Sequence, residues 1–322
     1  MIRELTTMVM AAHAAAILGA GEITLNSSSD FYAGRPSAAV VEVPGGAGKQ
    51  LSWSVSFLGA TTASGTQAIP ASGSVKLVFT FPQTSPGVVA EGALKCSAAG
   101  MTLSKPLRFY PENPFADQKE FLRKMAVEVW AASDDDRLAE LLAKLEVPFR
   151  AIDNLSAFDG KTLLVSGVDF DAFPGAGEDL RKIAAKGALV VALAPAGALG
   201  LDFNLADQVT LGANAQILKF DKKLDCEFWG EGVPAAKALR LGAEDDSPTL
   251  EVVDAQRTKL TFCQARYGLG AVIVTTWDVA GKAELSPTPV YLLAKIFERF
   301  TYLALPEESA SKGNERVIEL LK

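Results

Sequence analysis

The pattern of hydrophobic residues changes near residue 110, and this change constrains the fold more than any other feature. Before it, short runs of alternating apolar and polar residues are separated by turns that contain glycine. In one run Trp53, Val55 and Phe57 alternate with serines, which is typical of a β-strand with one buried and one solvated face. After it, apolar runs alternate with segments of helical spacing. The chain is therefore expected to form two domains of different class.

The first part, residues 21–110, is predicted to be an all-β domain. Six or so short strands at this spacing favour an antiparallel β-sandwich of immunoglobulin-like type. The expected strands are Glu22–Asn26, Ala38–Val43, Leu51–Leu58, Val75–Phe81, Val88–Cys96 and Thr102–Phe109.

The second part follows a linker at Pro111–Pro114 and is predicted to be an α/β domain over residues 115–303. Continuous apolar runs suit parallel strands whose two faces are covered by helices. The expected strands are Ala126–Trp130, Phe149–Ile152, Thr162–Val165, Ala188–Leu193 and the hairpin pair Leu260–Arg266 and Ala271–Thr275. One helix is expected to begin after Ser133–Asp136. Two others are expected to span Gly177–Lys186 and Pro289–Phe300. The stretch Leu201–Asp246 is less regular and is interpreted as an inserted or edge β segment.

The two ends of the chain have their own patterns. Residues 1–20 combine Arg3, an apolar stretch and small residues near Ala20, as in a secretory signal peptide, although a retained amphipathic helix would have a similar pattern. We therefore expect export to the periplasm or the outside of the cell. No later apolar run reaches the ~18 residues of a membrane helix, so no membrane span is expected in the mature chain. Residues 304–322 are expected to form a tail with a short helix.

Residue counts exclude several kinds of chemistry. The net charge is -7, which argues against a nucleic-acid-binding surface. The one histidine, His13, lies within the predicted signal peptide, so the processed chain would contain no imidazole. Cys96, Cys226 and Cys263 match no zinc-binding spacing. The sequence does not decide whether two of them form a disulfide. We expect no metal and no cofactor.

The second domain resembles the class I glutamine-amidotransferase-like fold, in particular the degenerate domains such as the trimerisation domain of some β-galactosidases. The segments Lys186–Pro195 and Ala265–Thr276 carry the resemblance. It implies a flavodoxin-like, mostly parallel sheet. In active members a nucleophile, usually Cys, stands on a tight bend after the central strand. Here that bend would be Ala194, Pro195 and Ala196, which offer no thiol or hydroxyl. The resemblance thus implies a degenerate nucleophile elbow and an inactive domain.

Carboxylates remain as candidate ligand-binding groups. Asp169 and Asp171 follow the strand Thr162–Val165, and ligands of open α/β sheets bind beyond the carboxyl ends of strands. Such a pair could perform acid–base chemistry or hold Mg²⁺ or Ca²⁺, but aspartates in this position more often cap a turn or helix. The acidic run Asp134–Asp136 fits a helix N-terminus and would repel a phosphate.

Two tryptophans are candidates for sugar binding. Trp130 and Trp277 are expected to end two strands at the same edge, and Asp278 follows Trp277. Aromatic faces beside carboxylates bind sugars, although buried aromatic side chains usually only fill the core. Trp229 is a candidate for a contact surface. The short motif Gly175–Gly177 is a weak dinucleotide signal and favours a helix start.

Three hypotheses for function follow. The first is an exported, non-catalytic binding or assembly protein with an inactive amidotransferase-like domain, whose partner is another protein or a second copy. The second is a carbohydrate-binding accessory of glycoside-processing enzymes, with a glycan as ligand. The third is a carboxylate-dependent hydrolase, with or without a metal ion. None of the three involves nucleic acid.

Overall fold

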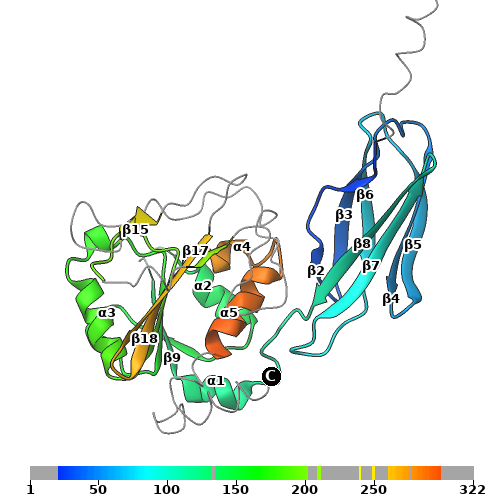
Figure 1. Cartoon of the computed structure of the whole chain (residues 1–322). Helices are drawn as coiled ribbons and strands as arrows, with labels where there is room; N and C mark the ends of the chain where they lie inside the picture. Colours follow the sequence, from blue (N-terminus) through cyan, green and yellow to red (C-terminus); the bar gives the residue numbers. More distant parts are fainter. Residues whose placement is uncertain are drawn as a thin grey trace, which may run out of the picture. The chain divides into compact units, whose positions relative to one another are not determined.

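A computed structural model describes residues 21–131, 135–201, 209–211, 239–240, 249–250, 260–275 and 278–298. The described residues form mostly β-structure in several sheets and fall into two compact units (Figure 1). The first unit contains the described residues up to 83 together with 89–109, and the second contains 84–88 and the described residues from 110 onward. The predicted signal peptide and the C-terminal tail lie outside the described residues.

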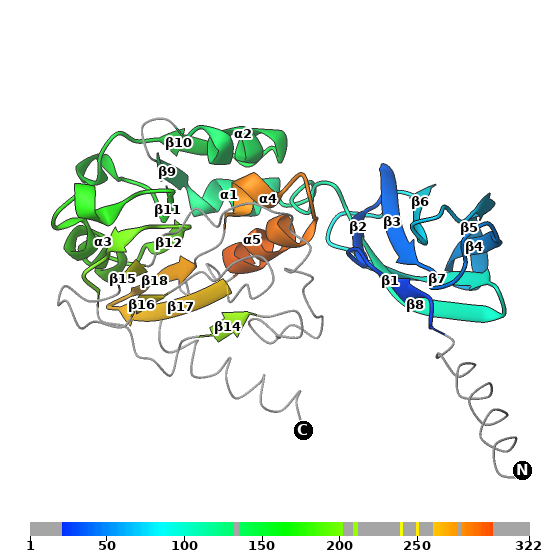
Figure 2. The same cartoon turned by 90° about the horizontal axis from the view of Figure 1, so that it is seen from above.

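The first unit contains two sheets, and its described pairings are antiparallel. The smaller sheet has the order β1-β3-β6, and the larger has the order β2-β8-β7-β4-β5 (Figure 2). The bounds are β1 Thr24–Leu25, β2 Asp30–Tyr32, β3 Pro36–Glu42, β4 Gln50–Phe57, β5 Ala60–Ala68, β6 Ser74–Thr80, β7 Ala90–Ala98 and β8 Met101–Tyr110.

One hydrophobic core serves both sheets of the first unit. Val41 and Leu77 from the smaller sheet and Leu51, Leu94 and Leu107 from the larger sheet are fully or almost fully buried in one cluster. Alternation within each strand produces this core, because every second side chain points to the same face. Burial of this apolar surface is the main stabilising contribution to the unit.

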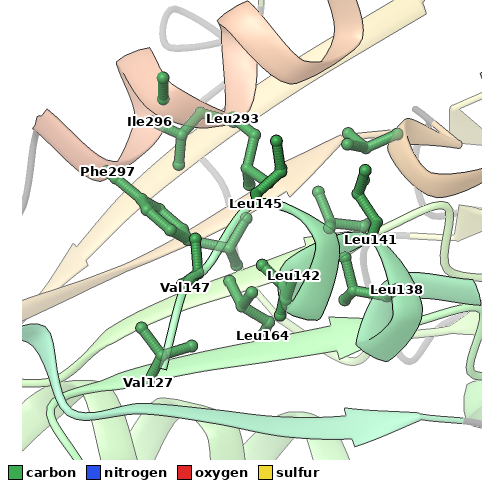
Figure 3. Close-up of a cluster of buried hydrophobic side chains, with 14 of the residues drawn as sticks. Val127, Leu138, Leu141, Leu142, Leu145, Val147, Leu164, Leu293, Ile296 and Phe297 are labelled. Carbon is green, nitrogen blue, oxygen red and sulfur yellow. The ribbon is translucent and has the colours of Figure 1, made fainter. Parts of the chain in front are cut away.

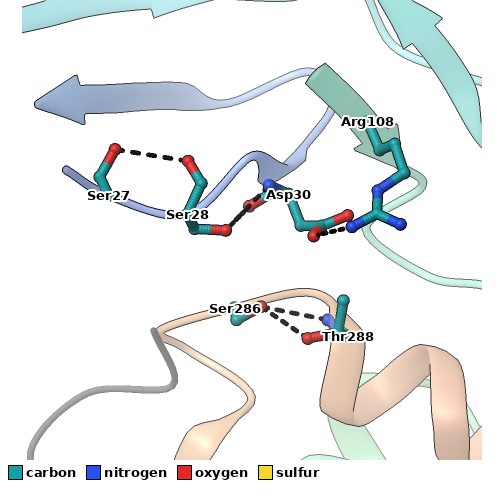
Figure 4. A network of polar contacts seen from close by, with 6 residues as sticks. All are labelled: Ser27, Ser28, Asp30, Arg108, Ser286 and Thr288. Carbon is teal, nitrogen blue, oxygen red and sulfur yellow. Dashed lines mark hydrogen bonds and ion pairs between the residues drawn. The ribbon is translucent and has the colours of Figure 1, made fainter. Parts of the chain in front are cut away.

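A buried ion pair lies beside that core. The Asp30 side chain is fully buried, and the Arg108 guanidinium on β8 donates to its Oδ2 at 2.5 Å (Figure 4). Ser28 Oγ accepts a hydrogen bond from the Asp30 backbone N–H at 2.8 Å. A buried carboxylate is tolerated only when it is paired and hydrogen-bonded, so Arg108 fixes the end of β8 against β2.

The strand β5 carries a bulge at the edge of the larger sheet. Its register with β4 shifts between Val55 and Ser56, so that Thr62 is the extra residue. The Thr62 hydroxyl donates to the Val55 carbonyl at 3.1 Å and anchors the irregularity. The sequence pattern missed β5 because its Ala, Thr, Ser and Gly residues show no apolar alternation.

The second unit is built on a seven-stranded sheet of order β10-β9-β11-β12-β18-β17-β14. The first five strands are parallel, and β17 and β14 are antiparallel to their neighbours. The bounds are β9 Val127–Ala131, β10 Phe149–Ala151, β11 Thr162–Ser166, β12 Leu189–Leu193, β14 Val209–Leu211, β17 Leu260–Tyr267 and β18 Gly270–Thr275. The helices are α1 Lys119–Met125, α2 Arg137–Lys144, α3 Ala176–Ala185, α4 Val279–Lys282 and α5 Thr288–Glu298, and the short strands β13 Gly197–Ala198, β15 Leu239–Arg240 and β16 Thr249–Leu250 pair separately.

Successive residues of the central strands enter two different cores. Leu189, Val191 and Leu193 of β12 pack in a cluster with α1, α2, α4 and α5, whereas Val190 and Ala192 pack in a cluster with α3. Figure 3 shows the first cluster, where leucines of α2 and the side chains of α5 meet the sheet. Both faces of the sheet are thus covered, which explains why its strands are continuously apolar.

The sequence predicted most of this sheet. The five parallel strands and the hairpin β17–β18 lie within a residue or two of their expected positions. Two details differ. Ala126 is not in a strand but ends α1, a helix not foreseen, with a left-handed φ of 42°. Within the irregular segment Leu201–Asp246, β14 forms the edge of the sheet, as an edge β segment would.

Candidate functional site

The parallel strands of the second unit end together at one edge of the sheet, which we call the carboxyl edge. Ser166 at the end of β11 is level with Ala131 of β9 and Leu193 of β12, and Leu193 is level with Thr275 of β18. The loops that follow these strands therefore meet at this edge. It is the place where open α/β sheets bind their ligands. Most of the predicted site residues lie on these loops.

The chain bends sharply after the central strand β12. Ala194 has a left-handed φ of 46°, which costs a residue with a Cβ roughly 1–2 kcal/mol. Its N–H donates to the Thr275 carbonyl at 2.9 Å, and the Ala196 N–H donates to the Val168 carbonyl at 3.0 Å. The residues of this bend are the ones that the resemblance implies for a degenerate elbow. Ala194, Pro195 and Ala196 present only hydrocarbon side chains to it.

Asp169 and Asp171 lie together on the loop after β11, where both side chains are used locally. Asp169 Oδ1 accepts from the Asp171 N–H at 3.1 Å, and Asp171 Oδ1 accepts from the Ala198 N–H at 2.9 Å. Gly197 is confined by this arrangement, since a Cβ there would lie 2.4 Å from Asp169 Oδ1. Both carboxylates are exposed and hold the loop against the segment that follows β12. This is the turn-forming role that the sequence offered as an alternative to ligand binding.

Arg137 joins two other acidic side chains at the same edge. Its guanidinium donates to Asp135 Oδ1 at 2.8 Å and Oδ2 at 3.0 Å, and to Asp278 Oδ2 at 3.2 Å. The hydrogen bond from Arg137 is the main reason why the pKa of Asp135 is lowered, and the same bond raises the pKa of Arg137. Asp278 also accepts from the Gly281 N–H and begins α4.

This ion-pair cluster fills the crevice of the carboxyl edge. The crevice lies where the chain passes from β10, on one side of β9, to β11 on the other. Asp135 packs so closely on Gly167 that a Cβ at residue 167 would lie 2.9 Å from its Oδ2. The cavity lined by Asp135, Arg137, Gly167, Ala194 and Asp278 has a volume of about 10 Å³. That volume holds one water molecule at most, so this cavity has no room for an organic ligand.

Trp130 is a core residue. It is 4% exposed, and its ring meets those of Phe170 and Phe173 edge-on, with centroids 6.3 and 5.2 Å away. The Trp130 ring therefore has no exposed face for a sugar, and it fills the core, as the alternative interpretation of the sequence proposed. The partner proposed for it, Trp277, lies outside the described residues, as do Trp229 and Asp134.

Two further sequence features have structural roles. Gly175 precedes α3 with φ 87°, and Gly177 lies so close to the next segment that a Cβ would be 1.6 Å from the Leu199 carbonyl oxygen. The motif Gly175–Gly177 is thus a helix start with a close backbone approach. Cys96 is a buried free thiol, and burial raises its pKa to about 11. Cys226 lies outside the described residues.

A larger cavity lies at the opposite, amino edge of the sheet. It has a volume of about 820 Å³ and is bordered by residues from the end of α1, the loop before β11 and the end of α3. Four lysines line it, namely Lys124, Lys161, Lys182 and Lys186. Sequence inspection missed it because these lysines are far apart in the chain and form no motif. Among the described residues, no group of three or more His, Cys, Asp or Glu side chains could hold a metal ion.

Comparisons with known proteins add little. No family model matches the chain, and no curated protein matches it. Among solved structures, an engineered protein shows 14% identity over 28% of this chain and 19% of its own, with a TM-score of 0.22. A proposed alpha-galactosidase from Bacteroides fragilis shows 13% identity over 55% of this chain and 39% of its own, with a TM-score of 0.17. Scores of this size support no conclusion about fold or function. In the part of the chain that is described, no helix combines the length and apolar character needed to cross a membrane.

Proposed function

We propose that this chain is an exported, non-catalytic binding or assembly protein, with an immunoglobulin-like first unit and an inactive amidotransferase-like second unit. The strand order supports the second assignment. Numbered along the chain, the five parallel strands are arranged 2-1-3-4-5, which is the flavodoxin-like order. The two antiparallel sheets around a common core support the first assignment.

The observation that carries the proposal is the filled crevice at the carboxyl edge. A hydrolase or amidotransferase of this class needs a nucleophile on the bend, a base within hydrogen-bond reach and space for the reacting group. Here the bend carries Ala194, and the space beside it is occupied by Arg137 and its two carboxylate partners. The remaining aspartates of the edge, Asp169 and Asp171, hold backbone N–H groups. Binding or assembly is the role that such a unit retains.

A turnover screen tests this proposal. The full chain is incubated with a nitrophenyl ester, with glutamine and with nitrophenyl glycosides, next to the variants Asp169→Asn and Asp135→Asn. We expect the same background rate for all three proteins. Turnover by the unaltered chain that disappears in Asp169→Asn, while the variant keeps its thermal stability, would overturn the proposal in favour of a carboxylate-dependent hydrolase.

A further inference from the structure

The cavity at the amino edge, which we call the lysine groove, has the size of a small-molecule site. Its volume of about 820 Å³ lies within the ~300–1,000 Å³ that such sites have. Three separate elements form it: the end of α1, the loop 155–161 between β10 and β11, and the C-terminal half of α3. The function proposed for the carboxyl edge does not involve this groove.

The groove is positively charged on a protein that is negative overall. Four lysines line it against two carboxylates, Asp159 and Asp179, whereas the whole chain has a net charge of -7. Lysines near the last turn of a helix also offset the helix dipole, which accounts for Lys124 and Lys182. That explanation does not extend to Lys161, which precedes a strand. A local field opposite to the overall charge concentrates ligands of one sign.

Two of the lysines have no carboxylate partner within the described residues. Lys124 pairs with Glu120 at 2.8 Å, and Lys182 lies 3.5 Å from Asp179. Lys161 and Lys186 form no ion pair in the part of the chain that the structure describes. Their ammonium groups are exposed and stand at the border of the same cavity. They can therefore bind a ligand anion without first losing an internal partner.

The floor of the groove is apolar. Leu155, Phe158 and Ile183 line the cavity, and each is partly exposed while it packs on the core beneath α3. Partly exposed apolar side chains at the base of a cavity gain free energy when a ligand covers them. Phe158 also offers an aromatic ring to a flat ligand.

The loop that carries this floor is fixed before any ligand binds. The Glu128 carboxylate, 6% exposed, accepts from the Arg150 guanidinium at 2.6 Å and from the Asp159 N–H at 3.3 Å. Arg150 also donates to the Ala157 carbonyl at 3.0 Å. Asn154 accepts from the Ala157 N–H and begins the short 3₁₀ turn Leu155–Ala157. A loop held at several points loses little entropy on binding, which favours affinity.

From this combination we propose that the lysine groove binds a small amphipathic anion, namely an aromatic or other flat apolar body that carries phosphate or sulfonate groups. The apolar body lies on Leu155, Phe158 and Ile183. The anionic groups bind Lys161 and Lys186, with Lys124 and Lys182 adding to the field. The ion pairs and the apolar floor supply the affinity together, so neither a simple anion nor an uncharged aromatic molecule binds as well.

The test uses a matched pair of fluorescent probes on the full chain. 8-Anilinonaphthalene-1-sulfonate carries one sulfonate, and N-phenyl-1-naphthylamine is its uncharged counterpart. We expect saturable binding of the sulfonate at one molecule per chain, competition by pyrophosphate, and clearly weaker binding of the amine. In the double variant Lys161→Gln, Lys186→Gln, the sulfonate should bind about tenfold more weakly, as expected when two exposed ion pairs are lost.

The control is a second double variant with the same change in charge, Lys49→Gln, Lys105→Gln. Both of these lysines are exposed and lie in the first unit, outside the groove. This control should bind the sulfonate like the unaltered chain. Equal binding by the two double variants, or equal affinity for the charged and uncharged probes, would overturn the proposal. The turnover screen is independent of this result, because no residue of the lysine groove takes part in it.

Discussion

Arg137 offers the sharpest test of how the carboxyl edge is held together. The change Arg137→Gln removes the guanidinium that binds Asp135 through two hydrogen bonds and Asp278 through one. The two carboxylates are 12% and 13% exposed, whereas Arg137 itself is 51% exposed. Charged hydrogen bonds are worth ~1.5–3 kcal/mol when buried, and solvent reduces this toward ~1 kcal/mol or less for exposed pairs. We expect a loss of about 1.5 kcal/mol at neutral pH.

The loss should depend on pH in a defined direction. Arg137 holds the pKa of Asp135 below its usual value, so the pair stabilises the folded state only while the carboxylate is charged. This stability is fully present above the pKa of an unfolded aspartate, about 3.9. It is lost as the pH falls through the lower, folded pKa. The unaltered chain and the variant should therefore become equally stable well below pH ~4.

Amide hydrogen exchange measures this difference without assuming that the whole chain unfolds in one step. Peptides that cover β11 and β12 report the free energy of opening of the second unit. The control is Arg181→Gln, which removes a similar bidentate pair with Glu178 on the exposed surface of α3. It should change exchange very little. If Arg137→Gln costs no more than Arg181→Gln, or if its effect persists in acid, the reasoning is wrong.

Three further outcomes are expected. Gly177→Ala should destabilise the second unit by about 2 kcal/mol or more in calorimetry, although helix propensity alone favours alanine by ~1 kcal/mol, because the new Cβ would meet the Leu199 carbonyl at 1.6 Å. Alkylation of Cys96, followed by peptide mass spectrometry, should stay slow at pH 8 and reach half its maximal rate near pH 11. Since folding disfavours the thiolate, stability should also fall above pH ~9. Arg108→Gln should lower the free energy of unfolding of the first unit by about 3 kcal/mol in urea unfolding, because it leaves the buried Asp30 carboxylate without its cation. Adding Asp30→Asn to this variant should restore part of the lost stability, because it removes the buried charge.

Much of the second unit could be predicted from its sequence. Continuous apolar runs such as Leu189–Leu193 have few alternatives to a buried parallel strand, and Gly268 and Gly270 mark the hairpin between β17 and β18. Leu138 and Leu142 follow the helical repeat. In these segments local preference and tertiary burial point to the same structure. The first unit was harder, since β5 is a strand through pairing alone, without an apolar face of its own.

The candidate sites show the limit of sequence reasoning. The family resemblance implied a bend at Ala194, because this residue follows an identifiable strand. The closure of the crevice depends on Arg137 reaching Asp278, 141 positions later in the chain, and no local pattern shows such a pair. Likewise the four lysines of the groove belong to three elements that only the fold brings together. Sequence gives the residues near one strand end, whereas tertiary structure decides which of them meet.

The irregularity in β5 has a consequence for self-association. A long outermost strand offers unpaired N–H and C=O groups to any second chain, and proteins commonly guard it with charge or proline. Ala60–Ala68 contains neither a charged residue nor proline. Protection of β5 from pairing with a second chain therefore depends on the β-bulge at Thr62. The bulge increases the local twist of the strand and interrupts the regular row of backbone N–H and C=O groups that intermolecular pairing requires. A chain that lost Thr62 would keep its hydrophobic core, but its exposed edge strand β5 would pair more readily with a strand of a second chain.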